Sequence, residues 1–78
     1  MKESLKAFYK RTIPGDDCAD RMDSAATFSD LVTGLINGVD VYDIIGVCDS
    51  FVRSTLFGRL AELMSVDYYT IYTLWFRA

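Results

Sequence analysis

The sequence predicts an all-α fold, a compact bundle of four to five short helices. Apolar residues recur at helical spacing in several segments, no segment shows sustained alternation of period two, and turn-forming Pro, Gly and Asn residues separate the segments. The 78 residues are 51% hydrophobic, and a chain of this size buries roughly 60% of the surface that it exposes when unfolded. We therefore expect residues 1–78 to form a single helical domain.

The first helix is expected over residues 2–12. Three apolar side chains recur at helical spacing among lysines in this segment: Leu5, Phe8 and Tyr9. Pro14 and Gly15 then end the helix, because proline cannot continue it and glycine favours a turn. The aspartate-rich residues 16–23 are expected to form a loop or a frayed turn.

The second helix has the clearest pattern in the chain. Five apolar residues repeat with the spacing i, i+3, i+4, i+7, i+8 and form one stripe: Phe28, Leu31, Val32, Leu35 and Ile36. Thr27 and Asp30 resemble a capping box at its start, and Asn37-Gly38 supplies a left-handed stop. We expect the whole stripe to face the core.

A third, short helix is expected after Asp40, which is a good helix cap. Val39 and Ile44 have the spacing of a hydrophobic staple across that cap. The apolar residues available for burial here are Ile44, Ile45, Val47 and Cys48. Gly46 is expected inside the helix, where glycine costs roughly 1 kcal/mol relative to alanine.

A fourth helix, capped by Asp49 or Ser50, is expected to continue to about Met64. Its inward-facing residues are expected to be Val52, Leu56, Leu60, Leu63 and Met64. Arg53 and Arg59 are expected to stay in solvent. Asp67 then caps a fifth helix, with Val66 and Ile71 as a second hydrophobic staple.

Residues 60–75 carry small or apolar side chains at the packing positions of two helices joined by a tight turn: Ala61, Val66, Ile71 and Leu74. In this spacing they resemble the helix-turn-helix unit of small transcriptional regulators. The resemblance implies that the second helix lies in the major groove of DNA and reads base edges. Ser65 stands where such units usually have glycine, and a left-handed conformation there costs roughly 1–2 kcal/mol. Two packed helices with this spacing also occur in domains that do not bind DNA.

The outward side of the last helix is aromatic rather than basic. We call the following residues the aromatic face: Tyr68, Tyr69, Tyr72, Thr73 and Phe76. Aromatic side chains are weak direct readers of bases but are favoured at protein interfaces. The sequence therefore predicts a partner-binding surface here, on a scaffold held by Leu56, Leu60, Ile71 and Trp75. The alternative is that the first helix folds over these side chains and makes them outer core.

Charge is unevenly distributed along the chain, whose net charge is −3. The first twelve residues carry +3. Residues 13–50, here called the central acidic segment, carry −7, because one arginine stands against eight acids: Asp16, Asp17, Asp20, Asp23, Asp30, Asp40, Asp43 and Asp49. Such a segment repels phosphates and attracts basic surfaces. These acids are interpreted as solvated loop charges, with imitation of a row of phosphates as the sharper alternative.

Binding to DNA is the competing hypothesis for function. The residues that would grip the phosphate backbone are Arg53, Arg59 and Arg77, with support from Lys6, Lys10 and Arg11. Tyr68, Tyr69 and Thr73 would then lie in the groove. A continuous positive face joining Lys6, Lys10, Arg53 and Arg59 would favour DNA over a protein partner.

Catalysis and metal binding find little support in the sequence. The chain has no histidine, so ordinary Ser-His and Cys-His pairs and mixed His/Cys zinc sites are excluded. The aspartates lack the spacing of a calcium loop. Cys18 and Cys48 are interpreted as reduced, semi-buried thiols, with a disulfide as the alternative. We expect a protein that is not an enzyme and that uses no metal and no cofactor.

The expected function is that of a small accessory regulator. No apolar run reaches the roughly 18 residues of a membrane span, and no signal-peptide segment follows the N-terminus, so we expect a cytoplasmic protein without membrane contact. It is expected to bind a protein partner with a basic surface, and a second copy of the chain is also a candidate partner. Its size is typical of inhibitors encoded by phages and mobile elements, which is an association with length alone.

Overall fold

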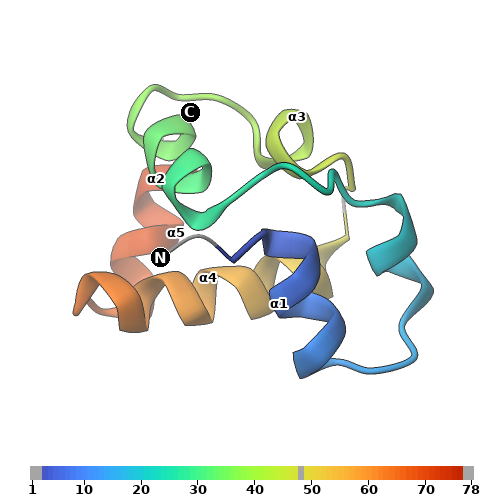
Figure 1. Cartoon of the computed structure of the whole chain (residues 1–78). Helices are drawn as coiled ribbons and strands as arrows, with labels where there is room; N and C mark the ends of the chain where they lie inside the picture. Colours follow the sequence, from blue (N-terminus) through green and yellow to red (C-terminus); the bar gives the residue numbers. More distant parts are fainter. Residues whose placement is uncertain (1–2, 48, 77–78) are drawn as a thin grey trace.

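Helix α4 (Ser50–Met64) is the long element against which α1 and α5 pack in the computed structural model (Figure 1). The structure describes residues 3–47 and 49–76. The other elements are α1 (Leu5–Thr12), the 3-10 helix η1 (Asp17–Arg21), α2 (Phe28–Ile36), α3 (Val41–Ile45) and α5 (Tyr68–Phe76). Figure 1 shows α2 and α3 together above α4, with α5 rising from the end of α4 toward α2. The prediction of an all-α bundle is confirmed.

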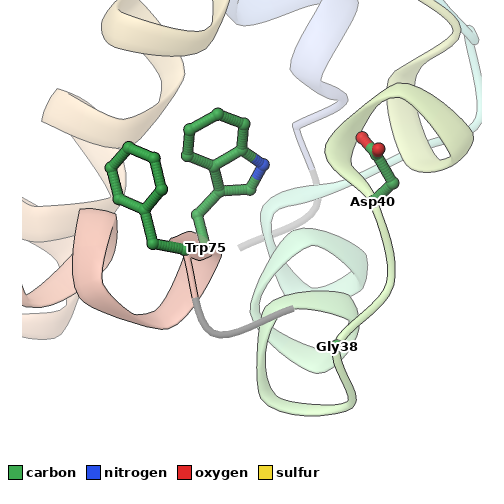
Figure 2. Close-up of a pocket in the computed structure, with 4 residues that line it drawn as sticks. Gly38, Asp40 and Trp75 are labelled. Carbon is green, nitrogen blue, oxygen red and sulfur yellow. The ribbon is translucent and has the colours of Figure 1, made fainter.

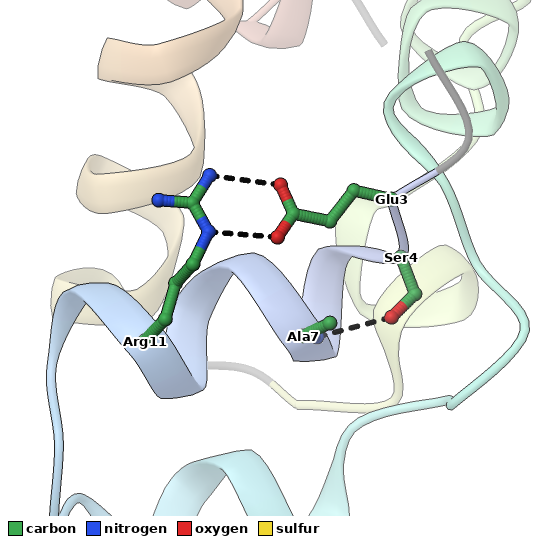
Figure 3. Close-up of polar contacts among 4 residues, drawn as sticks. All are labelled: Glu3, Ser4, Ala7 and Arg11. Carbon is green, nitrogen blue, oxygen red and sulfur yellow. Dashed lines mark hydrogen bonds and ion pairs between the residues drawn. The ribbon is translucent and has the colours of Figure 1, made fainter.

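Helix α1 begins at Leu5 because Ser4 caps it, with the Ser4 hydroxyl accepting from the Ala7 amide at 3.0 Å (Figure 3). Glu3 reaches forward along the helix to Arg11 and accepts two hydrogen bonds, at 2.7 and 2.9 Å. This pair is exposed to solvent, so it contributes little to stability. Burial of Leu5 and Tyr9, both 0% exposed, is what holds α1 in place.

The segment 16–23 is more ordered than the sequence predicts. Asp16 accepts from the Cys18 amide at 2.9 Å and starts η1. The Tyr9 hydroxyl also donates to Asp16, and the Asp23 amide donates to the Ile45 carbonyl at 3.0 Å. Helix α1 directly precedes this segment, whereas α3 is distant in sequence, so local capping patterns could not reveal the contact with Ile45.

Helix α2 has the predicted capping box, since Thr27 and Asp30 each accept from the backbone amide of the other. Its stripe is buried only in part. Phe28, Leu31 and Leu35 are in the core, Val32 is half-buried, and Ile36 is 66% exposed. The prediction for Ile36 was wrong because α2 ends at this residue, where neighbouring elements no longer cover the side chain.

Helix α3 starts at the predicted cap, Asp40, which accepts from the Tyr42 amide at 2.9 Å. Gly46 does not lie inside the helix as expected. It is the residue that ends it, with φ of 78°, a conformation that glycine adopts without the strain of a side chain. Gly34 of α2 lets α3 approach closely, because a Cβ atom there would overlap the Ile44 side chain.

Helix α4 has Asp49 as its cap and buries Val52, Leu56 and Leu60 as predicted. Leu63 and Met64 were also expected inward, but they are 39% and 37% exposed. The chain leaves α4 directly after them, so its neighbours cover the last turn of that stripe only in part. Conversely, the sequence analysis missed a fully buried residue of α4, Phe57. Helices α1 and α5 both cover α4, so its buried residues do not form one simple stripe.

Ser65 ends α4 in the left-handed conformation, with φ of 55° and ψ of 42°. A side chain costs roughly 1–2 kcal/mol in this region, whereas glycine adopts it freely. Ser65→Gly should therefore raise the unfolding free energy by about 0.5–1 kcal/mol. This gain is smaller than the cost of the left-handed conformation, because glycine loses more chain entropy than serine on folding. Urea unfolding followed by circular dichroism measures the change. Ser65→Ala is the control, and an equal gain in that variant would contradict the explanation.

Candidate protein-binding surface

Helix α5 follows α4 through the short connection of residues 65–67. Asp67 starts the helix as expected, accepting from the Tyr69 amide at 2.7 Å. Ile71 is fully buried, while Val66, Leu74 and Trp75 are partly buried against the same core. The inward side of α5 therefore includes the predicted residues Ile71, Leu74 and Trp75, and in addition Tyr72, which the sequence placed on the outward side.

The aromatic face divides into exposed and supporting residues. Tyr69 and Phe76 are 78% and 73% exposed, Thr73 is exposed, and Tyr68 is 37% exposed. Tyr72 is different, because it is half-buried and packs edge-on against Phe57 with ring centroids 5.3 Å apart. Tyr72 therefore offers less of its side chain to a partner than Tyr69 and Phe76 do. The alternative in which α1 covers this face does not hold for Tyr69 and Phe76, because both side chains remain exposed to solvent.

A cluster of packed aromatic rings, tilted or edge-on to one another, supports the exposed part of this face. The Phe76 ring lies 4.7 Å from Trp75 and 6.0 Å from Tyr72, measured between ring centroids. Trp75 in turn packs edge-on against Phe57 of α4. Phe76 is thus exposed but held by neighbouring rings, which lowers the entropy it would lose on binding.

Arg53 is part of this cluster and not a solvent-exposed cation. Its guanidinium lies 4.2 Å from the centre of the Trp75 ring, an arrangement typical of a cation–π contact. The Arg53 Nε atom is buried and has no hydrogen-bond partner among the described residues. The Ser54 hydroxyl lies 3.3 Å from the Tyr72 hydroxyl, and this contact, with Arg53 nearby, holds the pKa of Tyr72 below its ordinary value.

Two of the other basic residues proposed to hold DNA have acid partners. Arg11 pairs with Glu3, and Lys10 lies 3.9 Å from Asp20. Arg59 was expected to lie in solvent but is half-buried. The hydrogen bond from Arg11 is the main cause that lowers the pKa of Glu3, and the charge of Arg59 adds to it. Arg77 lies outside the described residues. Carboxylates therefore interrupt the positive surface that DNA binding would need.

Most of the central acidic segment is used to start helices and turns. Five of its aspartates accept hydrogen bonds from backbone amides two or three residues away: Asp16, Asp23, Asp30, Asp40 and Asp49. Asp17, Asp20 and Asp43 are exposed. The positions of the five capping acids are thus explained by local folding. Of the other three, Asp20 lies near Lys10.

Cys18 is half-buried, with its Sγ atom 3.6 Å from an Asp49 oxygen. Burial raises the pKa of this thiol, and the carboxylates of Asp16 and Asp49 raise it further. The thiol therefore stays protonated at neutral pH, which makes it a poor nucleophile. Cys48, and with it the proposed pairing of the two cysteines, lies outside the described residues. Within the described part of the chain no three potential metal ligands gather.

The Tyr9–Asp16 contact gives a pH prediction. The hydroxyl of buried Tyr9 and the Cys18 amide lower the pKa of Asp16 below its ordinary value of 3.8. A carboxyl with a lowered pKa stabilises the fold above that ordinary value, and the stabilisation is lost as the pH falls through the lowered pKa. Asp16→Asn keeps the cap but removes the charge, so its unfolding free energy should vary less between about pH 5 and about pH 2.

The check for Asp16 is urea unfolding at a series of pH values. Tyr9→Phe removes the donating hydroxyl and should weaken the same pH dependence, while Asp17→Asn, at an exposed neighbour, serves as the matched control. An Asp16→Asn profile parallel to that of the unchanged chain would show that the contact does not set acid stability.

Comparisons with protein-family models, with curated proteins and with solved structures found no match to this chain. None of the described helices is long and apolar enough to cross a membrane. Function must therefore be argued from the surface itself.

Proposed function

We propose that this protein is a small, non-enzymatic regulator that binds a protein partner through the aromatic face of α5. The observation that carries the proposal is the exposure of Tyr69 and Phe76, at 78% and 73% of their surfaces, on one helix. With Thr73 they occupy positions i, i+4 and i+7, which lie on the same side of a helix. An inhibitor encoded by a phage or mobile element is one form that such a regulator takes.

The chemistry of this face suits a protein interface. Aromatic side chains provide large contact areas with few rotatable bonds and are enriched among the residues that dominate binding energy. Tyr69 also has a hydroxyl that can hydrogen-bond to a partner. The central acidic segment would steer this face toward a partner with a basic surface, because opposite charges accelerate association.

Sequence-specific DNA binding is the second hypothesis, and the basic residues give it less support. Arg53 packs on Trp75, while Arg11 and Lys10 have carboxylate neighbours. If DNA were the ligand, affinity would fall steeply with added salt. An electrophoretic titration with duplex DNA at low salt tests this directly, and binding that weakens with salt would favour DNA.

The proposal is tested by capture from the native host with the purified chain as bait, using nuclease-treated and untreated extracts. A protein partner should be retained after nuclease treatment by the unchanged chain and lost by the double variant Tyr69→Ala/Phe76→Ala. Tyr42→Ala is the control, because Tyr42 is 51% exposed but lies on α3, which packs against α2. A partner that the double variant retains would rule out this surface.

A further inference from the structure

A pocket of about 270 Å³ lies between the end of α5 and the connection from α2 to α3 (Figure 2). The described residues that line it are Gly38, Asp40, Trp75 and Phe76. Pockets for whole small molecules usually measure about 300–1,000 Å³. This one is smaller, so its size suits a single side chain better than a complete ligand.

The pocket combines an aromatic wall with one negative charge. Trp75 and Phe76 provide neighbouring rings with centroids 4.7 Å apart. Asp40 is the charged residue among the described lining residues, and Figure 2 shows the indole nitrogen of Trp75 on the side where Asp40 lies. One Asp40 oxygen caps α3 by accepting from the Tyr42 amide, which fixes the carboxylate, and a carboxylate has room for further donors.

We propose that this pocket receives a lysine or arginine side chain of the protein partner. The apolar stem of that side chain lies along the Trp75 and Phe76 rings, and its cationic end pairs with Asp40. Basic side chains commonly bury their stems on apolar surface in this way. The proposal rests on the proposed function, because Phe76 belongs both to the pocket and to the aromatic face.

The charge around the pocket favours a cation over an anion. Asp40 is the acid that lines it, and exposed Asp43 follows Asp40 on α3. Arg53 is the opposing charge, since its guanidinium already occupies a position over the Trp75 ring. Attraction to that ring is therefore weakened for a second cation, and recognition depends on Asp40.

A small probe can test the pocket before the partner is known. Trp75 is the one tryptophan of the chain, so its indole N–H gives a single NMR resonance that reports on this pocket and on the ring cluster around it. We expect n-butylguanidinium to shift that resonance in a saturable manner, and n-butanol, which has the stem without the charge, to shift it much less.

The decisive variants are Asp40→Asn and Asp43→Asn, which change the net charge equally. Asparagine caps helices about as well as aspartate, so Asp40→Asn should keep α3 and its circular dichroism. We expect it to weaken n-butylguanidinium binding by about fivefold or more, since it removes a charge-assisted hydrogen bond, whereas Asp43→Asn should change binding by less than about twofold.

Equal effects of the two variants, n-butanol binding as tight as that of the cation, or no indole response would each overturn the inference. Tyr69→Ala separates it from the proposed function, because Tyr69 does not line the pocket. That variant should lose affinity for the partner while keeping the n-butylguanidinium response. If the pocket did not bind n-butylguanidinium but the chain still bound its partner, the aromatic face would remain the proposed interface.

Discussion

Phe57→Ala should lower the unfolding free energy by about 3–5 kcal/mol, the usual cost of removing a buried phenylalanine side chain. Phe57 is 0% exposed and lies where α4 meets α5. Its ring packs edge-on against Tyr72 at 5.3 Å and against Trp75 at 6.3 Å. Domains are stable by only about 5–15 kcal/mol in total, so this variant should be close to unfolding at room temperature.

Urea unfolding followed by far-ultraviolet circular dichroism measures this loss, and near-ultraviolet spectra report the packing of Trp75. The matched control is Phe51→Ala, which makes the same substitution on the same helix at a side chain that is 54% exposed. We expect the control to change stability by no more than about 0.5 kcal/mol. Equal losses in the two variants would show that the Phe57 cluster does not hold α5 in place.

The starts of α2, α3, α4 and α5 could be predicted from the sequence because they depend on local chemistry, whereas α1 was expected at residue 2 and begins at Leu5. Thr27, Asp40, Asp49 and Asp67 each accept from a backbone amide two or three residues further on, as expected of caps. A side-chain oxygen can satisfy an otherwise unpaired amide without any help from the rest of the fold. The fold class and most helix boundaries followed from such contacts together with apolar periodicity.

The extent of burial could not be predicted in the same way, because periodicity identifies a helix face but not how much of it is covered. Ile36, Leu63 and Met64 continue apolar stripes past the point where neighbouring helices end, so they stay exposed. Tyr72 shows the opposite case, since Phe57 and Ser54 of α4 draw it inward from the aromatic face. These outcomes depend on where α4 and α5 meet, which local sequence does not specify.

The candidate surface was predicted in part for the same reason. Tyr68, Tyr69, Thr73 and Phe76 follow from helical spacing alone, and they are the exposed residues of the aromatic face. The placement of Arg53 over Trp75 and the pocket beside Asp40 join residues distant in sequence. Only the packed structure brings these groups together, although an arginine and a tryptophan on adjacent predicted helices are a weak signal of such a contact.

Tyr69→Ala/Phe76→Ala should weaken binding to the purified protein partner by about 100-fold or more, the largest functional effect that we expect. Aromatic residues at the centre of an interface commonly contribute 2 kcal/mol or more each on truncation, and about 2.8 kcal/mol corresponds to 100-fold in affinity. Both side chains are more than two-thirds exposed in the free chain, so their removal should leave the unfolding free energy nearly unchanged. Titration calorimetry gives the affinity, and urea unfolding gives the stability.

Tyr72→Ala and Tyr69→Phe make the result specific to this surface. Because Tyr72 packs on Phe57 and contacts Ser54, its truncation should reduce stability, whereas the Tyr69 and Phe76 changes should reduce affinity alone. Tyr69→Phe keeps the ring and should keep most of the affinity if apolar contact dominates. Should Tyr69→Ala/Phe76→Ala bind within about threefold of the unchanged chain, recognition would depend on another surface. The exposed aromatic rings of α5 would then need a different explanation.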